Sequence, residues 1–306
     1  MPDWDAIIIG GGPAGLTAGL YLCRGGWRTL LIEKASVGGY IMNVETIENY
    51  PGFPEGVIGS QLAMEMKNQA TKYGLKIERG EVTALQASSG QKFIRCADGN
   101  TYTAAAVIIA GGSVHKELGV PGEERFQGNG VIYCGFCDGG QFFDRVIAVC
   151  GGGDAGITEA LYMANIASKV IVIEAMPELT ATAILQERAR ENPKIEIRCG
   201  VKVLEIVGNE QVTGIEIVEE KEEKERIEVD GVLVHVGLDP ATDYLEGAVP
   251  LDEQKQIKVN QTMETEVPGI FAAGDIRSGS PRQVAGAVGD GAIAGLAAQR
   301  FLQKYQ

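Results

Sequence analysis

Short apolar runs alternate along the chain with segments that have the period of amphipathic helices. The first run, Asp5 to Ile9, leads into a glycine-rich turn, an apolar helix through about Cys23 and a second run, Thr29 to Ile32. Short apolar runs of this kind are typical of strands that are buried on both faces of a parallel sheet. The order of strand, turn, helix and strand predicts an α/β protein.

The same alternation continues to the end of the chain. Strands are expected over 81–86, 92–97, 101–103, 107–110, 195–198, 203–207, 212–218 and 231–236, with another apolar strand running into Gly274. An amphipathic helix is expected over 60–73, and an Ala/Gly-rich helix over 284–302. Small residues on that last helix would allow it to pack closely against a cofactor or a sheet.

The first glycine turn has the G-x-G-x-x-G spacing of a dinucleotide-binding unit. Gly10 permits a tight turn, Gly12 lets the backbone approach a pyrophosphate, and Gly15 lets the helix pack closely on the strand. The helix N-terminus then directs its dipole at the phosphates. Glu33, after the second strand, is placed to accept hydrogen bonds from a ribose diol. The unit therefore predicts a nucleotide site.

The unit occurs a second time in the middle of the chain. Gly151, Gly153, Gly156 and Glu174 repeat the pattern, and 23 positions separate the first glycine from the acid in both copies. Internal repetition of this kind predicts two Rossmann-type domains rather than one large sheet with a second glycine loop.

Composition excludes some classes of function. A chain of 306 residues is long enough for two domains, and its net charge of −14 opposes non-specific binding to nucleic acid or to an anionic membrane. No apolar run approaches the roughly 18 residues of a membrane span, and no signal-peptide pattern opens the chain. We therefore expect a cytoplasmic protein that binds neither nucleic acid nor a membrane.

Of six cysteines, only Cys134 and Cys137 are closely spaced. The other four lie singly in apolar surroundings and are expected to be small buried side chains. A Cys-x-x-Cys pair can hold two electrons as a dithiol and release them as a disulfide. In a reducing cytoplasm, such a pair is more often catalytic than structural. Its position just before the second glycine turn suggests an enzyme that carries electrons from a bound flavin to an external disulfide.

Taken in order, these segments resemble the low-molecular-weight thioredoxin reductases over essentially the whole chain. The motifs that carry the resemblance are the two glycine turns, Glu48-Asn49-Tyr50-Pro51-Gly52, Pro121-Gly122-Glu123, Cys134-x-x-Cys137-Asp138-Gly139, Gly274-Asp275 and Arg282-Gln283. The resemblance implies a homodimeric FAD enzyme that reduces thioredoxin or a similar small protein. It also implies an FAD-binding domain formed by 1–113 and 245–306, into which a second nucleotide-binding domain, 114–244, is inserted with the cysteine pair.

The resemblance further implies roles for single residues. Cys134 would attack the substrate disulfide, Cys137 would face the flavin, and Asp138 would donate protons. The residues implied for FAD are Gly10, Gly12, Pro13, Ala14, Gly15, Glu33, Lys34, Gly39, Tyr40, Asn49, Val82, Ala110, Gly111, Gly274, Asp275, Arg282, Gln283 and Val284. Those for a nicotinamide nucleotide are Gly151, Gly153, Asp154, Ala155, Gly156 and Glu174. No residue is expected to bind a metal.

The chain departs from the family pattern where the electron donor would bind. Members that use NADPH carry His-Arg-Arg-x-x-x-Arg after the second strand of the inserted domain, whereas the stretch 174–180 here has no basic residue. The chain thus resembles the members that lack this motif. NADPH is expected to be a poor donor, and NADH and reduced ferredoxin are equal candidates.

Other departures leave two further points open. Asn129 stands where an arginine helps thioredoxin to dock, and Gly140-Gln141 stands where two aromatic residues are usual. The docking mode and the identity of the protein substrate are therefore open. Tyr40 replaces a glutamine that is usual after the two glycines, which alters the flavin environment in a way that the sequence does not define.

Two other functions fit the cysteine pair less well. A flavin-dependent dithiol oxidase would use the same cysteines with oxygen as the electron acceptor. A structural zinc site would need two ligands besides Cys134 and Cys137. There is no second Cys-x-x-Cys, and the histidines are His115 and His235 alone.

Overall fold

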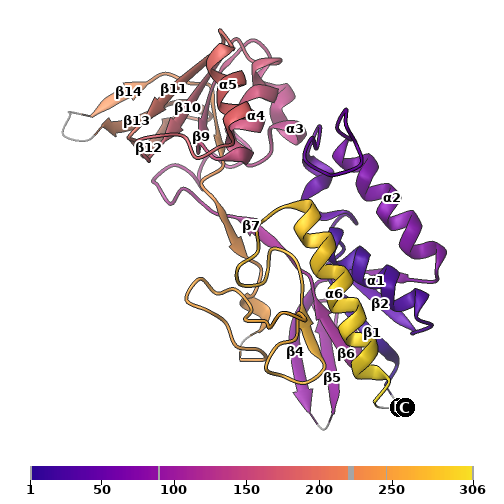
Figure 1. Ribbon diagram of the computed structural model, residues 1–306. Coiled ribbons are helices and arrows are strands. Elements are labelled where there is room, and N and C mark those ends of the chain that lie inside the picture. The colour runs from indigo at the N-terminus through magenta and orange to yellow at the C-terminus, as the bar shows by residue number, and fades with distance from the viewer. Residues whose placement is uncertain (1, 89, 220–223, 246, 305–306) are drawn as a thin grey trace. The chain divides into compact units, whose positions relative to one another are not determined.

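The computed structural model describes residues 2–88, 90–219, 224–245 and 247–304. The chain forms two compact units, one made of Met1–Val114 with Asp239–Gln306 and the other of His115–Leu238 (Figure 1). The predicted fold class is confirmed, because each unit is α/β with a sheet that is wholly or mainly parallel and the second unit is inserted into the first. Where the chain passes between the units, strands β7 (Ser113–His115) and β16 (Leu238–Pro240) pair with each other.

The first unit is built on a seven-stranded sheet in the order β3-β2-β1-β6-β5-β4, with β17 paired to β6. Its strands are β1 (Trp4–Ile9), β2 (Thr29–Glu33), β3 (Lys76–Arg79), β4 (Val82–Ser88), β5 (Gln91–Cys96), β6 (Thr101–Ile109) and β17 (Ile270–Ala272). Its helices are α1 (Pro13–Arg24), α2 (Gly59–Lys72) and α6 (Val284–Leu302), with short 3-10 helices η1 (Gly39–Asn43) and η3 (Asp243–Leu245).

The central strand of this sheet is buried on both faces because it is a continuous apolar run. Ile8 of β1 packs into a cluster that also contains Leu16 of α1 and Ala294 of α6. Ile7 belongs to the cluster on the other face, with Leu245 of η3. β1 pairs in parallel with both β2 and β6, so its carboxyl end and the start of α1 lie at the centre of the sheet edge.

The second unit contains a five-stranded parallel sheet in the order β11-β10-β9-β15-β8 and an antiparallel sheet in the order β12-β13-β14. Its strands are β8 (Val131–Ile132), β9 (Val146–Cys150), β10 (Lys169–Glu174), β11 (Ile195–Cys199), β12 (Val201–Gly208), β13 (Val212–Glu219), β14 (Glu225–Ile227) and β15 (Gly231–Val234). Its helices are α3 (Gly135–Asp138), α4 (Asp154–Ala164), α5 (Ala183–Glu191) and the 3-10 helix η2 (Gly139–Phe142). No helix in the described part of either unit has the length and apolar character of a bilayer span.

The sequence-based prediction was wrong around Ala104. The two strands expected over 101–103 and 107–110 are one strand, β6. Ala104 pairs with Trp4 of β1 and with Lys92 of β5, so the ladder continues through residues that have little strand preference of their own. Strands β3 and β8 and helix α5 were not expected, since β3 and α5 are largely polar and β8 has two residues.

Helix α6 packs against helix α1 as well as the sheet, and Figure 1 shows the two helices side by side. Glycines make this close approach possible. A Cβ added to Gly291 would overlap the carbonyl oxygen of Ala14, and one added to Gly295 would come within 3.0 Å of the Tyr21 Cβ. By contrast, a Cβ on Gly289 of the same helix would meet no atom within 4 Å.

Gly291→Ala and Gly289→Ala should therefore change stability in opposite directions. Gly291→Ala forces α1 and α6 apart and should lower the free energy of unfolding by about 1–3 kcal/mol. Gly289→Ala only reduces the entropy lost on folding and should raise the free energy of unfolding by about 0.5–1 kcal/mol. Urea titrations followed by circular dichroism measure both. Equal midpoints for the two variants would show that the helix contact is not tight.

Candidate functional site

The first glycine turn is tight at its ends and open in its middle. Gly10 has φ 107°, and a Cβ there would overlap the carbonyl oxygen of Ala110. A Cβ on Gly15 would overlap the carbonyl oxygen of Gly10. At Gly12, the nearest atom to an added Cβ is the Cα of Gly39, 4.0 Å away. The turn thus leaves space for a ligand at the position predicted to approach a pyrophosphate.

The start of α1 faces this open position with unpaired donors. Gly12 is the N-cap and makes no capping hydrogen bond with a side chain, and Pro13 occupies the first turn without an N–H group. The N–H groups of the first helical turn, such as those of Ala14 and Gly15, have no partner within the helix. They and the helix dipole suit a phosphate group.

Glu33 closes the turn from the end of β2. Its Oε2 accepts a hydrogen bond from the N–H of Gly11 at 2.6 Å, and its Oε1 accepts one from the N–H of Ala35 at 2.8 Å. A carboxylate has about four acceptor positions, so these two bonds fix its orientation and leave lone pairs for a ribose diol. The structure is consistent with the predicted role and shows a second one, which is to hold the turn.

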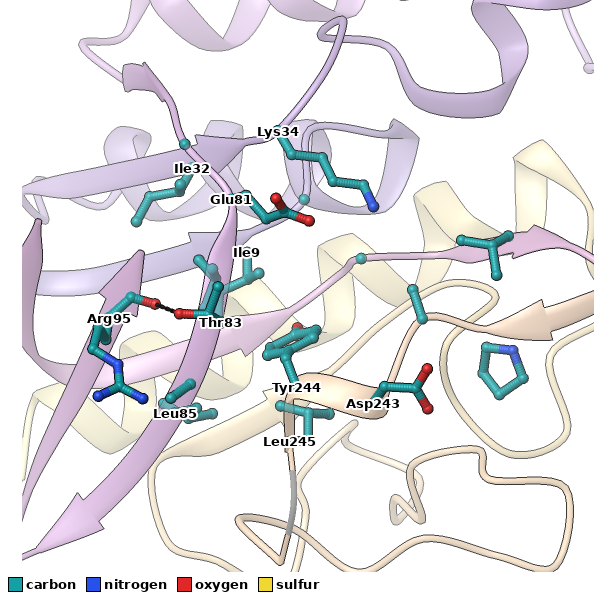
Figure 2. A pocket seen from close by; sticks show the side chains of 18 of the residues that line it. Ile9, Ile32, Lys34, Glu81, Thr83, Leu85, Arg95, Asp243, Tyr244 and Leu245 are labelled. Carbon is teal, nitrogen blue, oxygen red and sulfur yellow. Dashed lines mark hydrogen bonds between the residues drawn. The ribbon is translucent and has the colours of Figure 1, made fainter. Parts of the chain in front are cut away.

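A cavity of about 820 Å³ adjoins this turn within the first unit (Figure 2). Its lining includes the predicted FAD residues Gly10, Glu33, Lys34, Val82 and Gly111. The cavity is also lined by Tyr244, whose buried hydroxyl has no hydrogen-bond partner among the described residues. The volume lies within the range of roughly 300–1,000 Å³ that is usual for small-molecule sites. These features fit the adenosine part of FAD.

A second group of predicted residues meets at the start of α6. The Nδ2 of Asn49 donates to the Oε1 of Gln283 at 2.9 Å, although the two residues are 234 positions apart. Gln283 is the N-cap of α6, so the free N–H groups that begin with Val284 lie beside this pair. Tyr40 is exposed on η1, and Arg282 has φ 53°.

The Gly274-Asp275 turn is held by residues that the sequence did not point to. Asp290, inside α6 and 5% exposed, accepts hydrogen bonds from the N–H of Gly274 at 3.1 Å and from Nε of Arg277 at 2.7 Å. Burial raises the pKa of Asp275, and a hydrogen bond from Ser280 at 3.0 Å opposes that shift. The sequence did contain one sign of this buried ion pair, because Asp290 is a charged residue within an otherwise Ala/Gly-rich helix.

The second glycine turn repeats the geometry of the first. Gly151 has φ 121°, and a Cβ on Gly156 would overlap its carbonyl oxygen. Glu174 accepts from the N–H of Gly152 at 2.6 Å and from that of Met176 at 2.8 Å. Asp154, the first residue of α4, accepts from the N–H of Thr182 at 2.7 Å, so part of its carboxylate is already engaged.

A cavity of about 450 Å³ is lined by Leu179, whose side chain also lies next to Gly152 of this turn, and brings in one base that sequence reasoning missed. It is lined by Pro177, Glu178, Leu179, Gln186, Arg190, Ile197 and Cys199. Arg190 comes from α5, the helix that was not expected, and its Nη2 donates to the Oε1 of Gln186 at 2.8 Å. Two acids, Glu174 and Glu178, and one arginine therefore lie near the second turn.

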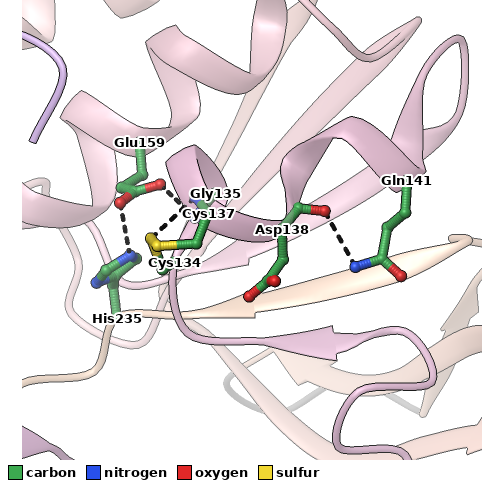
Figure 3. Close-up of a disulfide and its surroundings, with 7 residues drawn as sticks. All are labelled: Cys134, Gly135, Cys137, Asp138, Gln141, Glu159 and His235. Atoms are coloured by element: carbon green, nitrogen blue, oxygen red, sulfur yellow. Dashed lines mark hydrogen bonds and ion pairs between the residues drawn. A yellow bond between two sulfur atoms is a disulfide. The ribbon is translucent and has the colours of Figure 1, made fainter. Parts of the chain in front are cut away.

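Cys134 and Cys137 form a disulfide across the four-residue helix α3, with their Cα atoms 5.4 Å apart (Figure 3). The N–H of Cys137 donates to the Sγ of Cys134 at 3.0 Å. Cys134 is buried, whereas Cys137 and Asp138 are exposed. The pair and the acid expected beside it are thus together, and one sulfur is accessible.

The remaining cysteines play no part in this arrangement. Cys96 and Cys150 are buried as expected, but Cys23 and Cys199 are only half-buried. Burial raises the pKa of Cys150 to about 12, which makes that thiol unreactive. Across the described residues, no three His, Cys, Asp or Glu side chains are grouped as a metal site would require.

Comparison with known proteins gives a consistent picture. Residues 4–291 match the family described as pyridine nucleotide-disulphide oxidoreductase. The chain is 40% identical to the thioredoxin reductase of Bacillus subtilis over 309 residues, which covers 99% of this chain and 96% of that protein.

Solved structures show the same likeness. The thioredoxin reductase of Lactococcus lactis in its FR conformation is 36% identical with a TM-score of 0.96, covering 99% of this chain and all of that one. The T. acidophilum thioredoxin reductase is 36% identical with a TM-score of 0.94 over 100% of both chains. A ferredoxin-flavin thioredoxin reductase from Clostridium acetobutylicum is 30% identical with a TM-score of 0.54, covering 98% of each chain.

Gly12→Ala should weaken flavin binding without disturbing the fold. The added methyl group meets no protein atom closer than 4.0 Å, so the free protein has room for it. It would occupy the space predicted for a pyrophosphate, and FAD affinity should fall at least about tenfold, or about 1.4 kcal/mol. Titration of the flavin-free protein with FAD and the melting temperature of the flavin-free protein measure the two effects. An FAD dissociation constant unchanged from the wild type would contradict the assignment.

Proposed function

The chain belongs to the pyridine nucleotide-disulphide oxidoreductase family, and we propose that it draws electrons from NADH or reduced ferredoxin rather than from NADPH. It is an FAD-dependent enzyme of the thioredoxin reductase type. The first unit would hold FAD, and the second would offer its glycine turn to a nucleotide and carry the cysteine pair. Electrons would pass through Cys134 and Cys137 to thioredoxin or a similar small protein. We further propose a homodimer in the cytoplasm.

The observation that carries this function is the disulfide at the start of α3. Bound FAD would supply two electrons to the Cys134–Cys137 bond. A thiolate on Cys134 would keep the hydrogen bond from the N–H of Cys137, which stabilises the charged form and so favours Cys134 as the attacking sulfur. The exposed carboxyl group of Asp138 follows Cys137 directly and can hold or release a proton there.

The case against NADPH is the charge around the second glycine turn. The 2′-phosphate of NADPH carries nearly two negative charges. The carboxylate of Glu174 is bonded to the turn, and Glu178 lines the nearby cavity. Each charge-assisted hydrogen bond to an arginine contributes roughly 1.5–3 kcal/mol. Without two such bonds, NADPH affinity would fall by about two to four powers of ten. Glu174 suits the free ribose diol of NADH.

Two observations bear on the finer choice of donor. Arg190 and Glu178 both line the cavity, and among the described residues that line it Arg190 is the one base that a 2′-phosphate could use. The similar Clostridium acetobutylicum structure is named a ferredoxin-flavin enzyme, which supports ferredoxin as a candidate for this chain. A net charge of −14 would repel an acidic ferredoxin unless basic side chains gather locally.

The two cysteines should not be equivalent. Cys134→Ser should leave a Cys137 thiolate able to give a long-wavelength charge-transfer band with the flavin. Cys137→Ser should leave Cys134 able to trap thioredoxin as a mixed disulfide. Visible spectra and non-reducing electrophoresis measure these outcomes, with Cys23→Ser, a half-buried cysteine of α1, as the control that keeps full activity. Wild-type rates of thioredoxin reduction in both single variants would remove the assignment. Oxygen uptake with a dithiol substrate would point to an oxidase instead.

Anaerobic bleaching of the flavin should rank the donors. NADH or reduced ferredoxin should bleach it rapidly, and NADPH should need concentrations about two to four powers of ten above those of NADH if nicotinamides are used. If neither NADH nor NADPH reduces the flavin but reduced ferredoxin does, ferredoxin is the donor. Bleaching by micromolar NADPH within a second would overturn the ranking. If NADPH bleaches the wild-type flavin rapidly but the Arg190→Ala flavin slowly, Arg190 is the base that binds the 2′-phosphate.

A further inference from the structure

A mostly buried carboxylate lies directly behind the redox pair and is not explained by the roles assigned so far. Glu159 comes from α4, and its Oε2 accepts a hydrogen bond from the N–H of Gly135 at 2.7 Å. Gly135 follows Cys134, so this bond holds the backbone at the start of α3. A Cβ on Gly135 would overlap that same carboxylate oxygen, so a larger residue here would displace the Glu159 side chain.

Behind Glu159 lies a buried histidine. Nε2 of His235 is 3.8 Å from Oε1 of Glu159, and their side chains are 3% and 13% exposed. Within the described residues, that nitrogen has no hydrogen-bond partner. Figure 3 shows Glu159 and His235 on one side of the cysteine pair and Asp138 on the other. The two groups are therefore a separate pair, distinct from the acid that the family resemblance singles out.

Burial opposes charge on both members of this pair. It raises the pKa of Glu159 to about 7, against the effect of the hydrogen bonds from Gly135 and Phe136. It lowers the pKa of His235 to about 4, and the nearby His115 lowers it further in the same direction. At neutral pH the histidine is neutral, and Glu159 lies close to its midpoint between carboxylate and acid. Small changes of charge at Cys134 can therefore move a proton onto or off Glu159.

Other ionisable groups surround the pair at greater distance. His115 of β7 has its ring centre 5.5 Å from that of His235 and 5.9 Å from that of Tyr133. Tyr133 donates to Glu123 at 2.8 Å. The titratable groups on the packed elements are thus His235, His115, Tyr133, Glu123, Tyr162, Cys134, Cys137 and Asp138. Of these, the cysteines gain charge when the disulfide opens, and Asp138 is the group already proposed to exchange a proton with them.

We propose that Glu159, with His235 behind it, is a positioning residue for Cys134 and takes up one proton when the disulfide is reduced. The inference rests on the proposed redox role of Cys134 and Cys137, but not on the donor or on thioredoxin. Glu159 acts through the backbone of Gly135 and through its charge. As a carboxylate it opposes a thiolate on Cys134, and as an acid it permits one.

The step balances when a small dithiol is the reductant. The dithiol gives two electrons and two protons and becomes a cyclic disulfide, while the Cys134–Cys137 bond breaks. One proton goes to the sulfur of Cys137 and the other to the carboxylate of Glu159, which leaves Cys134 as a thiolate beside a neutral acid. On re-oxidation the thiolate attacks a substrate disulfide, and the two protons leave to the two substrate sulfurs by way of solvent.

The test is the pH dependence of the reduction equilibrium. Wild-type holoenzyme and Glu159→Gln are equilibrated in mixtures of reduced and oxidised dithiothreitol between pH 6 and pH 9. Trapped thiols in the Cys134–Cys137 peptide then give the equilibrium constant. Glutamine keeps an oxygen that can accept from Gly135 but cannot take up a proton. Glu187→Gln, an exposed glutamate of α5, is the matched control.

We compare the equilibrium constant for disulfide reduction in the wild type with that in Glu159→Gln. The ratio of the two should fall at least fivefold as pH rises from 6 to 9, because only in the wild type is reduction coupled to proton uptake by Glu159, and a rise in pH opposes that uptake. A ratio constant within twofold would mean that Glu159 is only a structural clamp and would overturn the proposal. The Glu187→Gln ratio should stay near one. If Glu159→Gln does not retain FAD, the proposal is tested instead by the infrared difference spectrum between the oxidised and the reduced wild type. A protonated-carboxyl band on reduction at neutral pH supports the proposal, and its absence refutes it.

Discussion

Both units depend on one steric constraint, which is that a helix can start directly against the end of a buried strand only where the backbone has no Cβ. At Gly15 and Gly156, a methyl group would overlap the carbonyl oxygen of the first glycine of the turn. Because the helix starts so close to the end of the strand, the N–H groups of its first turn point toward the edge of the sheet. The glycines that permit this packing therefore also leave backbone N–H groups free at the helix start, and such groups suit an anion.

The carboxylate at the end of each second strand links this constraint to function. Glu33 and Glu174 each accept two backbone N–H groups, one from their own glycine turn. They are thus structural as well as ligand-facing, and a turn held by a carboxylate presents negative charge where a nucleotide ribose would lie. An enzyme with this design has to supply bases from elsewhere to bind a 2′-phosphate. In the second unit, α5 brings Arg190 to the neighbouring cavity.

Around the disulfide, burial has a second effect. The sheet edge of the second unit places Glu159, His235 and Cys134 together in surroundings where charge is unfavourable. Opening a disulfide creates negative charge, and the low-dielectric surroundings couple that charge to any nearby group that titrates close to neutral pH. Two acids lie near the pair in different surroundings. Asp138 is exposed, and the side chain of Glu159 is mostly buried.

The sequence by itself determined the two βαβ units, the cysteine pair and helix α6, whose predicted limits of 284 and 302 are confirmed. These features follow from local rules: glycine spacing, apolar period and the position of an acid after a strand. Only the tertiary structure decided that β6 is one strand, that Asn49 meets Gln283, and that Glu159 and His235 lie behind Cys134. These arrangements join residues far apart in the chain, and their free energy comes from burial and hydrogen bonds that no local pattern encodes.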